Sequence, residues 1–182
     1  LDNGKEVAWF GLKKQLPMSQ SFDDSSAEWG YYYISGDKAM CVSQSAIDYF
    51  VASGNLNFAY EPAHRKYIVA CDSFSVGDDL TFGMMTVAFD DTCSIFYFGD
   101  WLKGYYFEKT GKTIVDAIQE SIDFSDKVFK KCNAFDAKLR KMAKPYGDDY
   151  LLVLYGALRQ TVGAHKLVMD RNGELLFLSK ES

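Results

Sequence analysis

The feature that most constrains the fold is a change of hydrophobic period near Gly111. Between Lys5 and Tyr106, segments rich in aromatic and β-branched residues alternate with clusters of Gly, Asp and Ser, which is typical of strands. These segments read EVAWFGLKKQL, EWGYYYISG, KYIVACDSF, LTFGMMTVAF and CSIFYFGDWL. They predict an antiparallel sheet or sandwich. The segment SQSAIDYFVASG differs, because its apolar residues recur at helical spacing and Gly54 follows, so it predicts a short helix.

After Gly111, apolar residues recur on one stripe at the helical period, with Lys, Asp and Glu on the other face. The stripe predicts one long amphipathic helix and consists of Ile114, Ile118, Ile122, Phe129 and Cys132. A shorter helix is expected in FDAKLRKMA, ending near Pro145 and Gly147. A third is expected in DDYLLVLYGALRQTVGAHKLVMD, where Asp148 and Asp149 suit an N-cap and the helix dipole.

The last segment contains a turn and a strand. RNGE predicts a tight turn in which Gly173 supplies the positive φ, and the apolar run LLFLS follows it. These patterns together predict an α+β chain. An antiparallel β-sandwich-like region is expected over residues 1–108, and a helical region with a terminal strand over residues 109–182.

Composition and charge restrict the classes of partner. The chain has 182 residues, of which 48% are apolar and 25% charged, as expected of a folded protein with its own core. Its net charge of -5, with both signs interspersed, leaves no basic stripe for phosphates. We therefore expect no nucleic-acid partner. No apolar run approaches the ~20 residues that span a bilayer, so no membrane span is expected.

Cysteine and histidine usage argues against a metal site. The four cysteines are far apart without a C-x-x-C pair, and we interpret them as buried free thiols, with a disulfide as the alternative. Only His64 and His165 are available, about a hundred residues apart, so no His-rich site can form. We expect neither a metal nor an organic cofactor.

Two short motifs resemble catalytic signatures but have structural explanations. Gly111, Lys112 and Thr113 follow Gly104 at a spacing too long for a phosphate-binding loop, so this segment is better read as the capped start of a helix. SGDK, beginning at Ser35, matches the Ser-x-x-Lys pattern of acyl enzymes. It follows a strand and contains Gly and Asp, which favours a turn.

Polar residues near the end of the chain are the candidate site. Arg159, Gln160 and Lys166 interrupt an otherwise apolar helical segment, and such a face meets either water or a buried anion. Lys180 and Glu181 follow an apolar strand, whose end either presents side chains to a cleft or carries charges at an exposed edge.

The segment DYLLVLYGALRQTVGAHKLVMDRNGELLFLSKES resembles the junction segment of the glutaminase A family of secreted bacterial and fungal enzymes. Members of that family carry a Tyr/Leu-Arg-Gln helix, then a Lys, an Asp and a Ser-Lys-Glu strand. EWGYYYIS, TVAFDDTCSIFYFGDWLKGYY and CNAFDAKL also resemble its N-terminal domain. Leu158 stands where the family often has Tyr. The positions that fit are Arg159, Gln160, Lys166, Asp170, Ser179, Lys180 and Glu181.

The resemblance implies a longer enzyme, with an N-terminal β-sandwich followed by an α/α toroid, that hydrolyses L-glutamine to L-glutamate and ammonia in the periplasm or outside the cell. We therefore expect this chain to be a fragment that is inactive by itself, with the toroid beginning in residues 109–182. Glu181 is the candidate catalytic carboxylate, and Lys180, Arg159 and Gln160 are the candidate substrate-binding residues. The oligomeric state is left open.

Ser179 is a weaker candidate nucleophile, because adjacent strand residues point to opposite faces and this disfavours its pairing with Lys180. A second hypothesis is a carbohydrate- or partner-binding module with Trp29, Trp101 and Tyr105 as a stacking platform. Core packing of these aromatic residues is the competing interpretation. A toroid acting on glycosides is a third hypothesis, which would need paired carboxylates.

Overall fold

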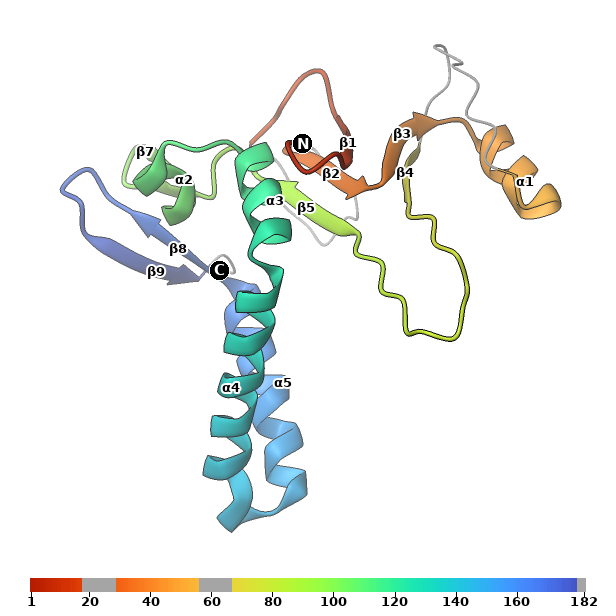
Figure 1. Cartoon of the computed structure of the whole chain (residues 1–182). Helices are drawn as coiled ribbons and strands as arrows, with labels where there is room; N and C mark the ends of the chain where they lie inside the picture. Colours follow the sequence, from red (N-terminus) through yellow and green to blue (C-terminus); the bar gives the residue numbers. More distant parts are fainter. Residues whose placement is uncertain (18–28, 56–66, 180–182) are drawn as a thin grey trace. The chain divides into compact units, whose positions relative to one another are not determined.

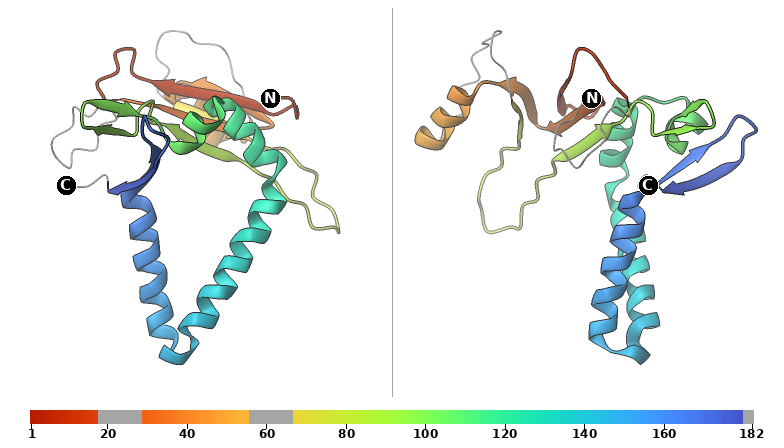
Figure 2. Two further views of the ribbon diagram at one scale, coloured as in Figure 1. Left: turned by 90° about the vertical axis from the view of Figure 1, so that its left-hand side faces the viewer. Right: turned by 180° about the vertical axis from the view of Figure 1, so that it is seen from behind.

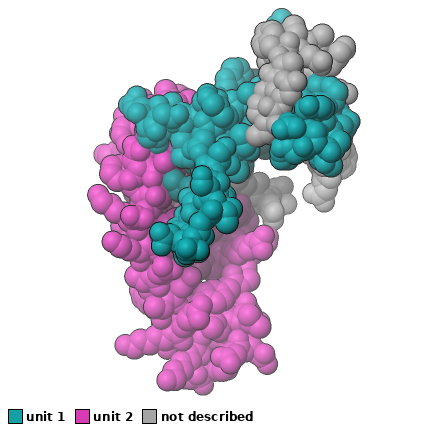
Figure 3. All heavy atoms as spheres, turned by 45° about the vertical axis from the view of Figure 1, so that its right-hand side comes forward, with its two compact units in different colours: residues 1–92 teal, residues 93–182 magenta. Residues whose placement is uncertain are grey.

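The computed structural model describes residues 1–17, 29–55 and 67–179 (Figure 1). The chain divides into two compact units, Leu1–Thr92 and Cys93–Ser182 (Figure 3). The sequence pattern placed a boundary at residue 108, where strands give way to helices, whereas the compact units divide before the last hairpin of the strand-rich part.

The first unit contains a three-stranded antiparallel sheet in the order β1 (Glu6–Gly11), β2 (Tyr31–Gly36), β5 (Thr86–Asp90). Its register aligns Phe10, Tyr32 and Phe89 across the three strands. The ring centroids of Phe10 and Tyr32 are 5.3 Å apart, and those of Tyr32 and Phe89 are 4.7 Å apart. Such cross-strand aromatic pairs stabilise a sheet beyond their burial, which explains the aromatic-rich segments.

Three further elements complete the described part of this unit. β3 (Lys38–Val42) and β4 (Tyr67–Cys71) form an antiparallel pair. Between them in sequence lies α1 (Gln44–Ser53), which confirms the predicted short helix. Gly54 ends it with φ of 69° while its N–H donates to the Phe50 carbonyl over 2.8 Å, as expected of a helix-terminating glycine. The Ser35–Lys38 motif lies at the connection from β2 to β3, as the turn interpretation predicted.

The second unit begins with the hairpin of β6 (Ile95–Tyr97) and β7 (Asp100–Leu102), followed by α2 (Tyr105–Thr110). Its helices are α3 (Ile114–Asp123), α4 (Ser125–Ala143), the single 3₁₀ turn η1 (Lys144–Tyr146) and α5 (Asp148–Ala164). The hairpin of β8 (His165–Met169) and β9 (Leu175–Ser179) follows. Leu102, Ile118 and Val168 are buried, and an isolated bridge pairs Gly104 with Val168.

The α+β fold class is confirmed, with small antiparallel sheets and several helices. The start of α3 also agrees: Thr113 and Asp116 form a reciprocal capping box, which accounts for the Gly-Lys-Thr segment without a phosphate. The β-sandwich and the toroid remain predictions.

The predicted helix boundaries were wrong in two places. The break between the long helix and the shorter one was predicted too late in the chain, after Cys132, because the chain breaks at Phe124 (φ -107°, ψ 14°) and then continues as one helix to Ala143. The third helix was drawn too long, because residues 165–169 form β8 and pair with β9. Gly147, not an aspartate, is the N-cap of α5, whereas Asp148 and Asp149 occupy the dipole-favoured first turn.

Candidate functional site

The predicted site residues are only partly within the described structure. Arg159 and Gln160 lie on α5 with exposed side chains, as expected of a solvated face. Lys180 and Glu181 lie outside the described residues, as does His64. The predicted contact of Arg159 with a substrate therefore stays a prediction.

The β8–β9 hairpin determines where the Ser-Lys-Glu segment begins. Its register pairs Ser179 with His165, the residue that directly follows α5 (Figure 1). The His165 ring stacks on Phe177 with centroids 4.8 Å apart, and its Nδ1 lies 2.7 Å from the Thr161 carbonyl oxygen. The predicted third helix included His165, which instead begins the strand. The hairpin thus returns Ser179 to the C-terminal end of the helix that carries Arg159 and Gln160.

Asp170 has a structural role in the turn between β8 and β9. One oxygen of its carboxylate accepts hydrogen bonds from the Asn172 and Glu174 N–H groups, each over 2.8 Å. Gly173 has φ of 82°, as predicted for the turn. Asp170 therefore holds the turn.

A polar cavity of about 300 Å³ lies beside this turn, between β7, α2 and β8. Arg171 forms an ion pair with Asp100 across its rim, and Lys103 and Glu108 also line it. The volume is at the lower end of the range for small-molecule sites. Carboxylates and cations of this kind suit a small polar or zwitterionic ligand.

The aromatic residues of the carbohydrate hypothesis lie in different units. Trp29 belongs to the first unit, and Trp101 and Tyr105 belong to the second. Trp101 lines the polar cavity, is 53% exposed and packs on Phe96 with ring centroids 4.5 Å apart. Trp101 alone therefore combines an exposed ring with a neighbouring cavity.

A polar triad connects α2 to α3. The Tyr106 hydroxyl donates to Glu120 Oε2 over 2.7 Å, and Lys112 forms an ion pair with the other oxygen of that carboxylate. Desolvation and the bond to Glu120 raise the pKa of Tyr106 to about 12, while Lys112 and Tyr106 hold the pKa of Glu120 below its usual value. At neutral pH the tyrosine is a hydrogen-bond donor, which makes the triad a fixed link between the two helices.

Tyr106 should make the second unit sensitive to alkali. Because its pKa is raised from 10.0 to about 12 in the fold, its contribution is fully present below pH ~10 and is lost as the pH rises through ~12. We expect Tyr106→Phe to remove about 1 kcal/mol of this pH dependence after solvent screening. Ultraviolet absorbance follows phenolate formation in Tyr106→Phe and in the exposed control Tyr146→Phe, and the Tyr106 variant should lack the tyrosine that ionises latest. The same amount of phenolate formed at the highest pH in both variants would contradict the raised pKa of Tyr106.

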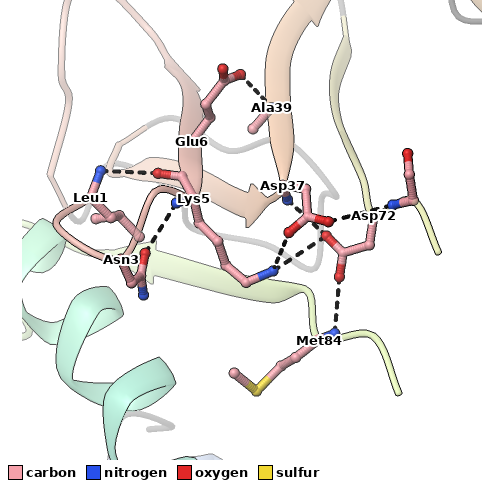
Figure 4. A network of polar contacts seen from close by, with 9 residues as sticks. Leu1, Asn3, Lys5, Glu6, Asp37, Ala39, Asp72 and Met84 are labelled. Atoms are coloured by element: carbon pink, nitrogen blue, oxygen red, sulfur yellow. Dashed lines mark hydrogen bonds and ion pairs between the residues drawn. The ribbon is translucent and has the colours of Figure 1, made fainter. Parts of the chain in front are cut away.

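The first unit contains a cluster of three charged side chains, shown in Figure 4. Lys5 Nζ lies 2.9 Å from Asp37 Oδ1 and 3.4 Å from Asp72 Oδ1. Asp72 also accepts from the N–H groups of Asp37 over 2.7 Å and Met84 over 2.9 Å. Its side chain is 4% exposed, compared with 51% for Asp37. Through these donors the buried Asp72 carboxylate joins the start of β1, the β2–β3 turn and the β4–β5 connection.

The pKa shifts of the cluster agree with this structural role. The hydrogen bond to Asp37 raises the pKa of Lys5, and Lys5 in turn lowers the pKa of Asp37. Both groups are therefore charged over a wide pH range. A general acid or base needs a pKa near the working pH, so neither is suited to proton transfer.

An apolar cavity of about 440 Å³ lies beside this cluster. Residues of α1, β3 and β4 line it, including Ile47, Phe50, Val42 and Cys71. Burial raises the pKa of the Cys71 thiol, and the neighbouring carboxylates raise it further. Because the thiolate is the nucleophilic form, Cys71 is inert at neutral pH. All four cysteines are free thiols, as interpreted from the sequence, but of the four Cys93 alone is buried and Cys132 is exposed.

Sequence reasoning missed the Lys5–Asp37–Asp72 cluster and the Arg171–Asp100 pair. Their members are far apart in the chain and have no motif spacing. The only available signal was the placement of Asp37 and Asp72 at strand ends, where polar side chains often converge. Within the described residues, no group of three or more His, Cys, Asp or Glu could hold a metal ion.

Comparisons with known proteins place the chain in a family. None of the helices in the described part of the chain is long and apolar enough to cross a bilayer. Neither a curated protein nor a solved structure matches the chain. The family model described as "Domain of unknown function (DUF5127)" matches residues 2–142. Since this match covers most of the sequence, the chain belongs to the DUF5127 family.

Proposed function

We propose that this chain is part of a secreted or periplasmic amidohydrolase that converts L-glutamine to L-glutamate and ammonia. The proposal rests on the resemblance of residues 149–182 to the glutaminase A junction segment. One structural observation supports it: the pairing of Ser179 with His165 starts the Ser-Lys-Glu segment next to the end of α5. Ser179, which the resemblance groups with Arg159 and Gln160, is thus paired beside the C-terminal end of the helix that carries them.

Amide hydrolysis needs an activated nucleophile, an oxyanion donor and an acid for the leaving amine. In this proposal Glu181 is the general base for water or the partner of the substrate ammonium group. Arg159 binds the α-carboxylate through a two-pronged contact that a lysine cannot make, and Lys180 and Gln160 complete the polar contacts. No metal or organic cofactor takes part. The remaining groups come from residues of the longer enzyme that the resemblance implies.

The test compares ammonia release from glutamine by that longer enzyme and by the present chain. We expect the enzyme to be active and residues 1–182 alone to be inactive. In the enzyme, Arg159→Ala should raise KM about tenfold to a hundredfold, because one charge-assisted contact contributes ~1.5–3 kcal/mol. Arg140→Ala is the control, since Arg140 is also an exposed helical arginine. Arg159→Lys should recover part of the loss.

The carbohydrate-binding alternative predicts that the longer protein binds glycans and releases no ammonia from glutamine. It is favoured by the exposed Trp101 ring beside the polar cavity. If the longer protein released no ammonia and bound glycans in a manner abolished by Trp101→Ala, the amidohydrolase proposal would be rejected. An unchanged KM in Arg159→Ala would reject the role of Arg159.

A further inference from the structure

The helix α4 carries an apolar stripe with the spacing of a coiled-coil seam. Val128, Cys132, Phe135, Leu139 and Met142 follow one another at alternating intervals of four and three residues. This is the a/d pattern of helices that pack side by side through knobs-into-holes contacts. The stripe therefore fits a neighbouring helix along much of its length.

Of the five stripe residues, Leu139 is buried, whereas Val128, Cys132, Phe135 and Met142 are exposed. Leu139 and Ala143, close to η1, are 7% and 1% exposed. Farther from η1, Val128 is 50% exposed and Phe135 is 46% exposed. Figure 2 shows the reason, because α4 and α5 meet at η1 and separate toward their other ends.

The facing part of α5 is equally uncovered. Val162, near the end of α5 that lies away from η1, is 62% exposed, whereas Leu151 and Leu158 are half-buried. Isolated exposed apolar residues are common, but the exposed members of the α4 stripe recur at regular helical spacing. A helix packed along α4 would cover them.

The charges beside the stripe indicate the chemistry of that helix. α4 carries six basic residues and two acidic ones, in a chain whose net charge is -5. By helical spacing, Lys127, Lys131 and Lys138 lie along the same side of the stripe. Neither Lys131 nor Lys138 forms an ion pair within the described residues. A partner with carboxylates along one edge would complement them.

We propose that the open part of the α4–α5 hairpin binds an acidic amphipathic helix of a partner protein. Apolar residues of that helix pack on Val128, Cys132 and Phe135, and its carboxylates lie against Lys131 and Lys138. A second copy of α4 in antiparallel pairing is a poor occupant, because the lysine rows of the two copies would then face each other. The proposal rests on different residues from the amidohydrolase proposal, but α4 and α5 lie in the region where the resemblance places the start of a toroid. Binding is therefore measured with this chain and with the longer enzyme, and loss of binding in the longer enzyme would overturn the proposal.

A designed peptide tests the surface directly. The probe is a fluorescein-labelled helix of about 21 residues with Leu at a and d and Glu at e and g, and the matched probe has Lys at e and g. Fluorescence anisotropy with the 182-residue chain should give micromolar binding of the Glu peptide and none of the Lys peptide. Equal binding of both peptides, or of neither, would overturn the proposal.

Variants locate the site and separate packing from charge. Phe135→Ala should weaken binding of the Glu peptide at least tenfold. Asn133→Ala, which shortens an exposed, uncharged side chain on the other side of the same helix, should change binding less than about twofold. Circular dichroism checks that both variants keep their helix content.

A charge reversal provides the second readout. Lys131→Glu combined with Lys138→Glu should exchange the preference, so that the Lys peptide binds and the Glu peptide does not. Added salt should weaken the wild-type complex. Unchanged preference in the double variant would contradict the docking surface. So would a dimer in sedimentation that Phe135→Ala dissociates, since that result would assign the stripe to a second copy.

Discussion

Replacing Asp72 by alanine is expected to lower the free energy of unfolding of the first unit by about 4 kcal/mol. The side chain is almost completely buried and accepts hydrogen bonds from Lys5 and from the N–H groups of Asp37 and Met84. Its removal leaves the N–H groups of Asp37 and Met84 without this acceptor and leaves Lys5 with Asp37 alone, and an unsatisfied polar group costs about 1–3 kcal/mol. The cost is large because the three donors come from separate strands and connections.

Urea denaturation measures this effect. The chain has three tryptophans, and two of them, Trp9 and Trp29, belong to the first unit. In a Trp101→Phe background their fluorescence therefore reports on that unit alone. Asp78→Ala is the control, because Asp78 is exposed on the same β4–β5 connection and should change stability by less than about 0.5 kcal/mol. Similar losses in both variants would show that the Asp72 contacts contribute little.

A second large effect is expected for Gly30→Ala, at about 3 kcal/mol. Gly30 has φ of 84°, a conformation that side chains other than glycine rarely adopt. A Cβ atom there would lie 2.6 Å from the Asp90 carbonyl oxygen and 2.6 Å from Cζ of Phe89. Backbone strain and steric overlap therefore add at the start of β2.

The matched control for this prediction is Gly54→Ala. Gly54 also has positive φ, at 69°, but no atom lies within 4 Å of the added Cβ. Its replacement should cost about 1 kcal/mol from the backbone alone. Urea midpoints in the same Trp101→Phe background give the difference between the two variants. A Gly30→Ala protein as stable as Gly54→Ala would mean that the neighbouring ends of β2 and β5 move apart to accommodate the new atom.

Local patterns in the sequence predicted the elements that depend on local interactions. The aromatic segments became β1, β2 and β5, Gly54 ended α1, and Thr113 capped α3. The break at Phe124 was not predictable, because apolar residues continue at helical spacing on both sides of it. HKLVM is compatible with helix or strand, and only its pairing with LLFLS decides between them.

The candidate sites were less predictable than the elements. Arg159 and Gln160 were correctly expected on a helix, but their role depends on residues that a single helix does not supply. Lys5 and Asp72 are sixty-seven positions apart, and their contact follows from how β1 and β4 are placed in the fold. The Arg171–Asp100 pair likewise joins two hairpin turns that no sequence spacing connects. Interactions of this kind are determined by tertiary structure.

The bridge between Gly104 and Val168 closes the base of a long excursion of the chain, from α2 to α5. Entry and exit are joined there, and the far end at η1 is held by its contacts with α4 and α5. Related proteins could therefore have longer or shorter α4 and α5, changed by the same number of turns, with the bridge unchanged. The length of the two helices would then set how far η1 lies from the β6–β7 and β8–β9 hairpins.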